Sequence, residues 1–152
     1  MSPTTIVDSI RREVPTLRHD QDVGSAAEAV IAADVPALPV VDEREHFVGV
    51  FGEREFIHAV FPPYFDTLGS AGFVPRSLDR ALERGATVTT EHVAGHMTTD
   101  HVETGPDPSD AELAEIFLHH RVLIVPICED HRPVAIVTRN DFFRALAEQL
   151  RA

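Results

Sequence analysis

The chain carries the same pattern of apolar runs twice, and this internal repetition limits its possible folds more than any other feature. The runs from Val35 to Asp42 and from Val122 to Glu129 each have a proline in the fifth place and an acidic residue at the end. Downstream, residues 47–60 and 133–146 align without a gap. A chain that repeats a unit of this kind is expected to fold as two related structural units.

Each copy reads as an extended segment followed by helix, strand, strand and helix. In the first copy these elements are predicted at about 15–18, 24–33, 37–41, 47–51 and 53–60. In the second copy they are predicted at about 102–104, 110–120, 123–128, 134–137 and 139–150. The first helix of the second copy opens with the capping box Ser109-Asp-Ala-Glu112.

Two segments fall outside the repeated pattern. Ile6, Ile10 and Val14 have helical spacing and predict an N-terminal helix over about 5–14. Residues 61–95 match neither copy; they begin as irregular chain and then predict a short helix over 77–84, capped by Ser77.

This insert is too apolar for a free linker, so we expect it to pack on its own module or on a partner chain. Its apolar residues are Phe61, Tyr64, Phe65, Leu68, Phe73, Val74, Leu78 and Leu82. The predicted organisation is a single module over 1–152, with repeat one at about 5–60, the insert at about 61–95 and repeat two at about 96–152.

Charge and hydropathy exclude several classes of function. The formal net charge of −12 repels phosphodiester backbones and anionic membranes, and no basic patch offsets it. No apolar stretch reaches the roughly 18 residues of a membrane span, and no secretory signal opens the chain. The single cysteine, Cys128, ends an apolar strand and is expected to be buried rather than nucleophilic. We therefore expect a cytoplasmic protein that neither binds nucleic acid nor inserts into membranes.

The sequence shows no catalytic or metal-binding pattern. The nine histidines lack the convergent spacing of a zinc site, and no cysteine accompanies them. No hydrolase motif, Gly-rich phosphate loop or nucleophile triad occurs. We therefore predict no catalytic residues and no metal ligands, and we expect the protein not to be an enzyme.

The repeated order of elements, together with three motifs of the second copy, resembles the cystathionine β-synthase (CBS) domain family. The motifs are the entry motif His96-Met-Thr-Thr-Asp100, the central strand at 120–127, and the strand 135–138 followed by Arg139, Asn140 and Asp141. A tandem pair of such domains is called a Bateman module. The resemblance covers the chain except for the insert and the extreme N-terminus.

This resemblance implies an α/β fold: two β-α-β-β-α repeats related by pseudo-twofold symmetry, with a partly helical insert between them. It also implies a homodimer and a regulatory role. Members of the family commonly sense an adenosine-type small molecule such as AMP, ADP, ATP or S-adenosylmethionine, and they control an enzyme, channel or transporter. The regulated partner of this chain is not indicated by the sequence, and no permanent cofactor is predicted.

Thr138 and Asp141 are the leading candidates for a nucleotide site in the second copy. They stand where a helix follows a strand, and the free N–H groups and dipole of that helix end favour a phosphate. Asp141 is placed to accept hydrogen bonds from ribose hydroxyls, and Arg139 and Asn140 lie beside it. The resemblance implies that the base lies against Val102, Thr104, Val125 and Pro126. The same Thr-x-x-Asp pattern is also a helix cap, which stabilises by about 0.5–2 kcal/mol without any ligand.

The first copy has Gly52 and Glu55 where the second has Thr138 and Asp141. Gly52 brings no hydroxyl, and Glu55 is one methylene longer than aspartate. We expect the first site to be empty, occluded or altered. An alternative from another class of function is a ligand-free scaffold for protein–protein interaction that uses the aromatic insert.

Overall fold

The first copy forms a small three-stranded sheet with two helices packed on it. The computed structural model describes residues 5–61 and 74–151. The elements of the first copy are β1 (Leu17–Arg18), α2 (Val23–Ala33), β2 (Ala37–Val41), β3 (Phe47–Gly52) and α3 (Glu53–Val60). The strands lie in the order β1-β2-β3, with β1 parallel and β3 antiparallel to β2. Both helices contact β3 and each other, so they cover one face of the sheet.

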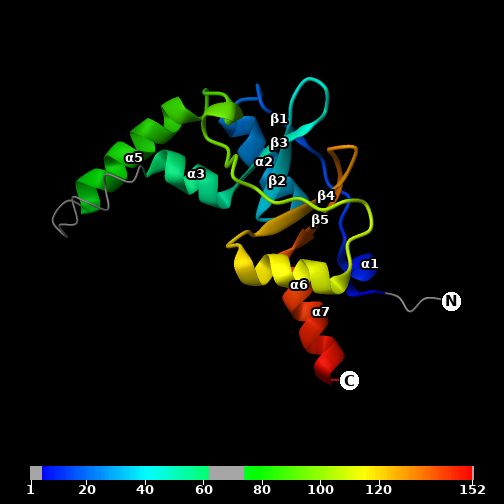
Figure 1. Ribbon diagram of the computed structural model, residues 1–152. Helices are drawn as coiled ribbons and strands as arrows, with labels where there is room; N and C mark the ends of the chain where they lie inside the picture. Colours follow the sequence, from blue (N-terminus) through cyan, green and yellow to red (C-terminus); the bar gives the residue numbers. More distant parts are fainter. Residues whose placement is uncertain (1–4, 62–73, 152) are drawn as a thin grey trace.

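The second copy repeats this arrangement (Figure 1). Its elements are α6 (Asp110–His119), β4 (Ile124–Glu129), β5 (Arg132–Thr138) and α7 (Arg139–Arg151). The strands β4 and β5 pair antiparallel, and Thr104 bridges Ile127 in the parallel direction, as β1 does in the first copy. The Ser109 hydroxyl accepts a hydrogen bond from the Glu112 amide at 3.0 Å, which confirms the predicted cap of this first helix.

The segment that leads into each copy crosses to the sheet of the other copy. The backbone of Arg12 pairs antiparallel with Ile136 of β5, through two N–H···O bonds of 2.9 Å. In the same way, Thr98 pairs with Val50 of β3 at 2.9 and 2.8 Å. The same number of residues separates Arg12 from Thr98 and Val50 from Ile136. The two crossings are therefore equivalent under the pseudo-twofold relation, and each copy completes the sheet of its neighbour.

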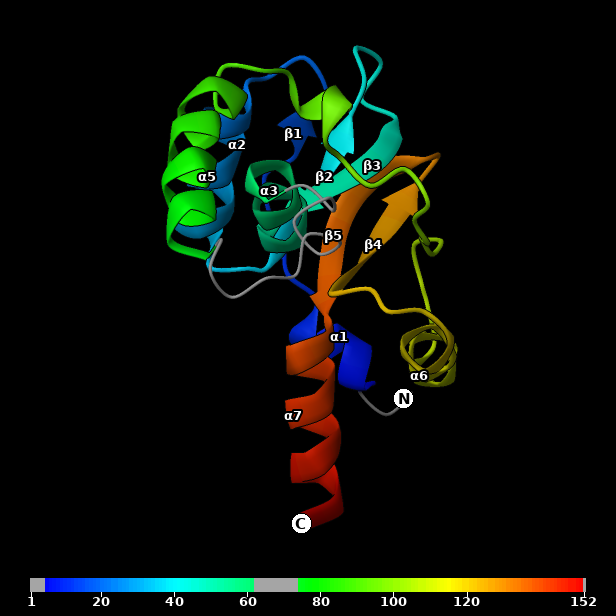
Figure 2. The same cartoon turned by 90° about the vertical axis from the view of Figure 1, so that its left-hand side faces the viewer.

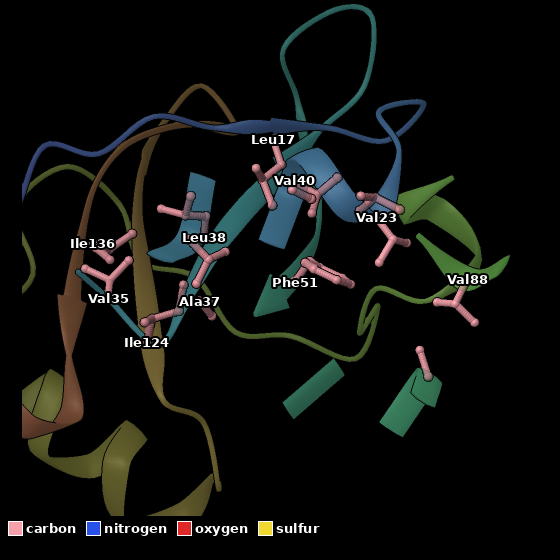
Figure 3. Close-up of a cluster of buried hydrophobic side chains, with 14 residues drawn as sticks. Leu17, Val23, Val35, Ala37, Leu38, Val40, Phe51, Val88, Ile124 and Ile136 are labelled. Atoms are coloured by element: carbon pink, nitrogen blue, oxygen red, sulfur yellow. The ribbon is translucent and has the colours of Figure 1, made fainter. Parts of the chain in front are cut away.

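The main hydrophobic core contains side chains from both copies. Figure 3 shows Ile124 and Ile136 of the second copy beside Val35, Ala37 and Leu38 of the first. A second cluster around Leu113, Val125 and Val137 lies within the second copy and also includes Val7 of the N-terminal helix. Burying one such side chain stabilises the fold by roughly 1.5–3 kcal/mol. The shared core therefore holds the two sheets in a defined relative position.

The N-terminal helix is shorter than the hydrophobic spacing predicts. The helix α1 spans Ile6–Ile10, whereas the prediction over 5–14 is wrong beyond Ile10. Arg11 is already extended, with φ −64° and ψ 136°, and Arg12 gives its backbone bonds to β5. Pairing with the sheet thus replaces helical hydrogen bonds, and Pro15 further disfavours helical geometry at Val14.

The described part of the insert packs on its own module. The helix α5 (Val74–Val88) contacts α3, and its last residue, Val88, joins the main core (Figure 2). The prediction that Ser77 caps a helix over 77–84 is wrong, because the helix begins at Val74 and places Pro75 in its first turn, where proline is tolerated. The aromatic residues Tyr64, Phe65 and Phe73 lie outside the described residues. A short 3-10 turn, η2 (Val93–Gly95), leads into the second copy.

None of the helices in the described ranges is long and apolar enough to cross a bilayer.

Candidate functional site

Thr138 and Asp141 meet at the start of α7, where they form a helix cap. The Thr138 hydroxyl accepts a hydrogen bond from the Asp141 amide at 3.0 Å. Thr138 is 3% exposed, so its hydroxyl faces the protein interior. The capping role that the sequence left open is therefore present in the structure.

The carboxylate of Asp141 is held by Arg12, which the crossing segment brings from the first copy. The Arg12 Nε lies 2.7 Å from one carboxylate oxygen and a terminal guanidinium nitrogen lies 3.1 Å from the other. This hydrogen-bonded pair lowers the pKa of Asp141, against a smaller opposing effect of burial, and raises the pKa of Arg12. The oxygens that were expected to hold a ribose are thus already bonded to a guanidinium in a charge-assisted, bidentate pair.

The other residues predicted for the second site do not gather around Thr138. Arg139 and Asn140 are exposed and border an apolar hollow between α2, α6 and α7. Thr104 pairs with Ile127, whereas Thr138 pairs with Ile124 at the opposite end of β4.

Val125 and Pro126 are buried within β4, and Val102 lines a crevice beside Glu55 of the first copy. The structure therefore does not bring all of the predicted residues together, because Val102 lies toward the first copy.

The corresponding position of the first copy uses the same geometry with different chemistry. One oxygen of Glu55 accepts a hydrogen bond from the Gly52 amide at 2.9 Å, and the other accepts one from the Thr98 hydroxyl at 2.6 Å. Thr98 is the equivalent of Arg12 under the pseudo-twofold relation. The extra methylene of Glu55 lets the side chain turn back to Gly52, so the carboxylate supplies the cap that Gly52 cannot.

Close packing explains the glycine at position 52. A Cβ atom there would lie 2.1 Å from the Pro36 carbonyl oxygen and 2.4 Å from the Ala37 Cα. Both contacts are with backbone, which cannot move aside without shifting β2. Threonine fits at the equivalent position 138 but not here.

A crevice of about 190 Å³ opens beside Glu55, between the two copies. The first copy contributes Ala37, Val50, Arg54 and Glu55, and the second copy contributes Thr98, Asp100, His101, Val102, His120, Arg121, Val122, Leu123 and Ile124. The expectation of an altered first site agrees with Gly52 and Glu55, but the site is not occluded. Apolar walls, the two acids Glu55 and Asp100, and the basic side chains of Arg54 and Arg121 face one space.

Basic residues from both copies meet at this crevice. An Arg54 guanidinium nitrogen donates to the backbone carbonyl of Arg121 at 2.8 Å, which ties α3 to the segment before β4. Arg121 and His120 stand beside this contact in the lining of the crevice. Arg54 and Arg121 balance Glu55 and Asp100 in this lining, so the crevice opposes an anionic group less than a surface typical of a chain with a formal net charge of −12.

His101 lines the crevice and carries a buried nitrogen without a partner. Its ring lies 3.9 Å from the ring of Phe47, centroid to centroid. Within the described ranges, its Nδ1 is the buried side-chain nitrogen or oxygen that lacks a hydrogen-bond partner. A buried nitrogen without a partner destabilises the fold by about 1–3 kcal/mol.

Sequence reasoning missed Arg12, Thr98, Arg54 and Arg121. A signal for the first two exists, because Arg12 and Thr98 are separated by the same interval as Glu55 and Asp141. The adjacent pair His120 and Arg121 stands directly before the central strand and was assigned to the strand motif alone.

Cys128 is 3% exposed, as predicted. Burial, together with contact with Glu103, raises the pKa of its thiol well above the usual range, so the nucleophilic thiolate is strongly disfavoured. Among the residues that the structure describes, no three His, Cys, Asp or Glu side chains are grouped in a way that would hold a metal ion.

Comparisons with known proteins agree with the repeated fold. The profile of the CBS domain family matches residues 7–62 and 92–148. An uncharacterized protein from Methanocaldococcus jannaschii is 21% identical over 137 residues, which is 90% of this chain and 41% of that protein. The chain thus spans about two-fifths of the length of that relative.

Solved structures share the fold over most of the chain. A putative acetoin utilization protein from Vibrio cholerae has a TM-score of 0.70 at 19% identity, covering 99% of this chain and 95% of that one. A CBS-domain protein from Agrobacterium tumefaciens has a TM-score of 0.68 at 25% identity, covering 93% and 90%. CBSX2, solved in complex with AMP, has a TM-score of 0.66 at 20% identity, covering 99% and 100%. With two matched segments that take up most of its length, the chain belongs to the CBS domain family.

Proposed function

We propose that this chain is a regulatory module that binds an adenosine-type nucleotide, such as AMP, ADP, ATP or S-adenosylmethionine, and thereby controls a partner protein. The observation that carries the proposal is the crevice at Glu55, in which two acids, basic side chains and apolar walls from both copies face one space. The complex of CBSX2 with AMP supports the ligand class.

Each part of a nucleotide has a matching surface in the crevice. Val50, Val102 and Ile124 offer apolar walls for a flat base. A carboxylate has about four acceptor positions, so the two bonds that Glu55 makes leave capacity for ribose hydroxyls. Arg121 supplies a guanidinium whose fork matches phosphate oxygens.

The site predicted from sequence at Thr138 and Asp141 is a second nucleotide position in this proposal, and Arg12 controls it. The guanidinium neutralises the charge of Asp141 and lies against both carboxylate oxygens, so a ribose there must share the carboxylate with Arg12 or displace it. Separating a bidentate ion pair is unfavourable unless a phosphate takes over the guanidinium. The crevice at Glu55 therefore fills first.

Regulation follows from the position of the crevice between the copies. A ligand that contacts both copies favours the relative arrangement to which it binds more tightly. In this proposal the module acts by binding rather than by catalysis. Small-angle scattering with and without AMP measures this change of arrangement directly.

The same proposal includes a homodimer. Exposed apolar side chains on α2, α6 and α7 border one hollow: Ile31 (78% exposed), Leu118 (81%), Phe143 (66%) and Leu146 (40%). In both views α7 projects beyond the sheets (Figures 1 and 2). A second copy that packs its own α7 and α6 here would bury these side chains. Leu118→Glu should then sediment as a monomer, whereas Leu82→Glu on α5 should not change the mass.

Isothermal titration calorimetry with AMP, ADP, ATP and S-adenosylmethionine tests the binding function. Arg121→Ala should weaken the affinity for the preferred ligand about tenfold, since it removes a charge-assisted hydrogen bond. Asp141→Asn should change the affinity less than twofold, and Arg151→Ala serves as a control for surface charge. The reverse ranking of Arg121→Ala and Asp141→Asn would contradict the assignment of the crevice. If the wild-type chain binds none of the four ligands, the sensor function is wrong and the scaffold alternative gains support.

A further inference from the structure

A second hollow lies next to the crevice and reaches the insert. It has a volume of about 480 Å³ and lies between α3, α5 and residues 95–98. Its lining consists of Arg54, Glu55, His58, Ala59, Arg84, Gly95, His96, Met97 and Thr98. Three of these residues, Arg54, Glu55 and Thr98, also line the crevice, so the two spaces are neighbours.

The hollow continues along α3 from the crevice. Arg54 and His58 stand one turn apart on this helix, as do Glu55 and Ala59, so both pairs follow the helix axis on adjoining faces. Figure 2 shows α3 between α5 and the strands. The bond between Glu55 and Thr98 borders both spaces, because both residues line each of them.

Among the described residues of this lining, basic groups outnumber acidic groups. Arg54 and Arg84 are positively charged, whereas Glu55 is the acid in this described lining and already accepts two hydrogen bonds. The Nε of Arg84 donates to the Ala59 carbonyl at 3.2 Å, which orients the side chain along α3, and its terminal nitrogens have no hydrogen-bond partner within the described ranges. His58 and His96 also line the hollow, and the Nε2 of His96 is bonded to Glu91 at 2.9 Å.

The volumes of the crevice and the hollow also favour one ligand that occupies both. Small-molecule pockets typically measure roughly 300–1,000 Å³. The crevice alone, at about 190 Å³, lies below that range, whereas the crevice and its neighbour together fall within it. The crevice thus has room for part of a nucleotide, and the remainder must extend beyond it.

We infer that the hollow along α3 is a subsite for the polyphosphate chain of a nucleoside di- or triphosphate, and that Arg84 of the insert helix makes the module prefer such ligands over a monophosphate. This inference rests on the proposed nucleotide function. Arg84 lies outside both matched CBS segments, so the insert adds this specificity to the shared fold.

Calorimetric titration of AMP and ATP, without divalent cations, into the wild-type chain and two variants tests the inference. Arg84→Gln removes the charge but keeps an amide that can donate to Ala59, and Arg80→Ala removes an exposed arginine one turn earlier on α5 that does not line the hollow. We expect ATP to bind more tightly than AMP to the wild-type chain. Arg84→Gln should weaken ATP binding about three- to fivefold, as expected for an exposed charge pair, and leave AMP binding unchanged.

The outcomes separate this inference from the proposed function. Equal losses of AMP and ATP affinity in Arg84→Gln, or equal affinities for both ligands in the wild-type chain, would overturn the subsite while leaving nucleotide binding intact. A loss of ATP affinity in Arg80→Ala as large as that in Arg84→Gln would assign the effect to general surface charge and would also overturn it. Absence of binding by either nucleotide would refute the proposed function itself. The thermal midpoints of both variants should match the wild type, which shows that α5 remains docked on α3.

Discussion

The two copies hold the acid at the start of their closing helix in different ways. In the first copy the neutral hydroxyl of Thr98 donates one bond to Glu55, and the Gly52 amide donates the other. In the second copy Arg12 donates a hydrogen bond to each oxygen of Asp141, and the hydroxyl of Thr138 caps the helix. Each acid accepts one bond on each oxygen, but the hydroxyl and the amide leave the negative charge of Glu55 in place, whereas the guanidinium neutralises that of Asp141.

In our proposal this difference reverses the ranking of the sites that the motifs alone indicate. The second copy has the Thr and Asp of the family pattern, but its acid forms an internal ion pair. The first copy has Gly52 and Glu55 instead, and a crevice opens at its acid. We propose that the residue that crosses from the other copy, rather than the local motif, determines which acid binds a ligand.

The largest expected effect comes from adding a side chain at Gly52, where the backbone of β2 leaves no room for the Cβ atom that Thr138 has at the equivalent position. Gly52→Ala should lower the free energy of unfolding by about 3 kcal/mol, because the added Cβ meets the Pro36 carbonyl at 2.1 Å. The equivalent change in the second copy, Thr138→Ala, removes a cap and should lower it by about 1 kcal/mol. Urea denaturation of the wild type and both variants measures the two losses in the free energy of unfolding. Equal losses would show that the two helix entrances are packed alike.

Removal of the guanidinium should make the second position resemble the first. Arg12→Ala should lower the free energy of unfolding by about 1–2 kcal/mol, a value between those of exposed and buried ion pairs, since the side chains are 40% and 18% exposed. It should also raise the stoichiometry of AMP binding from one to two per chain. Arg11→Ala is the matched control. An unchanged stoichiometry would refute the role of Arg12 as the residue that blocks this position.

The same pair predicts a dependence of stability on acid pH. Arg12 lowers the pKa of Asp141 in the folded state, so the unfolded chain binds the proton first as the pH falls. The stabilisation is therefore complete above the unfolded value of about 3.9 and is lost as the pH falls through the lower folded value.

The difference in unfolding free energy between the wild type and Asp141→Asn should accordingly shrink below about pH 4. Denaturant titrations of both chains at a series of pH values provide the measurement. A difference that stays constant over this range would mean that Asp141 does not titrate with the pair.

The smallest effect is expected in the first copy. Thr98→Val keeps the shape of the side chain and removes the hydroxyl that donates to Glu55, so it should lower the free energy of unfolding by about 0.5 kcal/mol. Thr99→Val, at the neighbouring exposed residue, is the control. A loss as large as that of Arg12→Ala would show that the two crossings contribute equally and would remove the contrast between the copies.

The elements that depend on local pattern were predictable from the sequence. The bounds of β2 and α3 agree with those predicted at 37–41 and 53–60, because a continuous apolar run marks the buried strand and the residues that follow mark the start of the helix. The helix α1 ends earlier than predicted because Arg12 pairs with β5. This contact joins distant parts of the sequence, so the local pattern does not indicate it.

The candidate site depends on contacts between the copies, and these were not predictable from either copy alone. Val102 was assigned to the second site because it precedes that copy in the chain, but the crossing places it beside Glu55. The ion pair between Arg12 and Asp141 joins residues at opposite ends of the sequence. Nothing in the sequence around either residue identifies the other as its partner. The contribution of α5 likewise arises from a segment that has no counterpart in the repeat.

We propose that nucleotide binds in the crevice at Glu55 while Arg12 closes the equivalent position. A crystal structure of the protein grown with AMP distinguishes the two positions. We expect ligand density bounded by Arg54, Glu55 and Arg121, with the bond between Arg12 and Asp141 intact. Density at Thr138 with Arg12 displaced and the crevice at Glu55 free of ligand would contradict it.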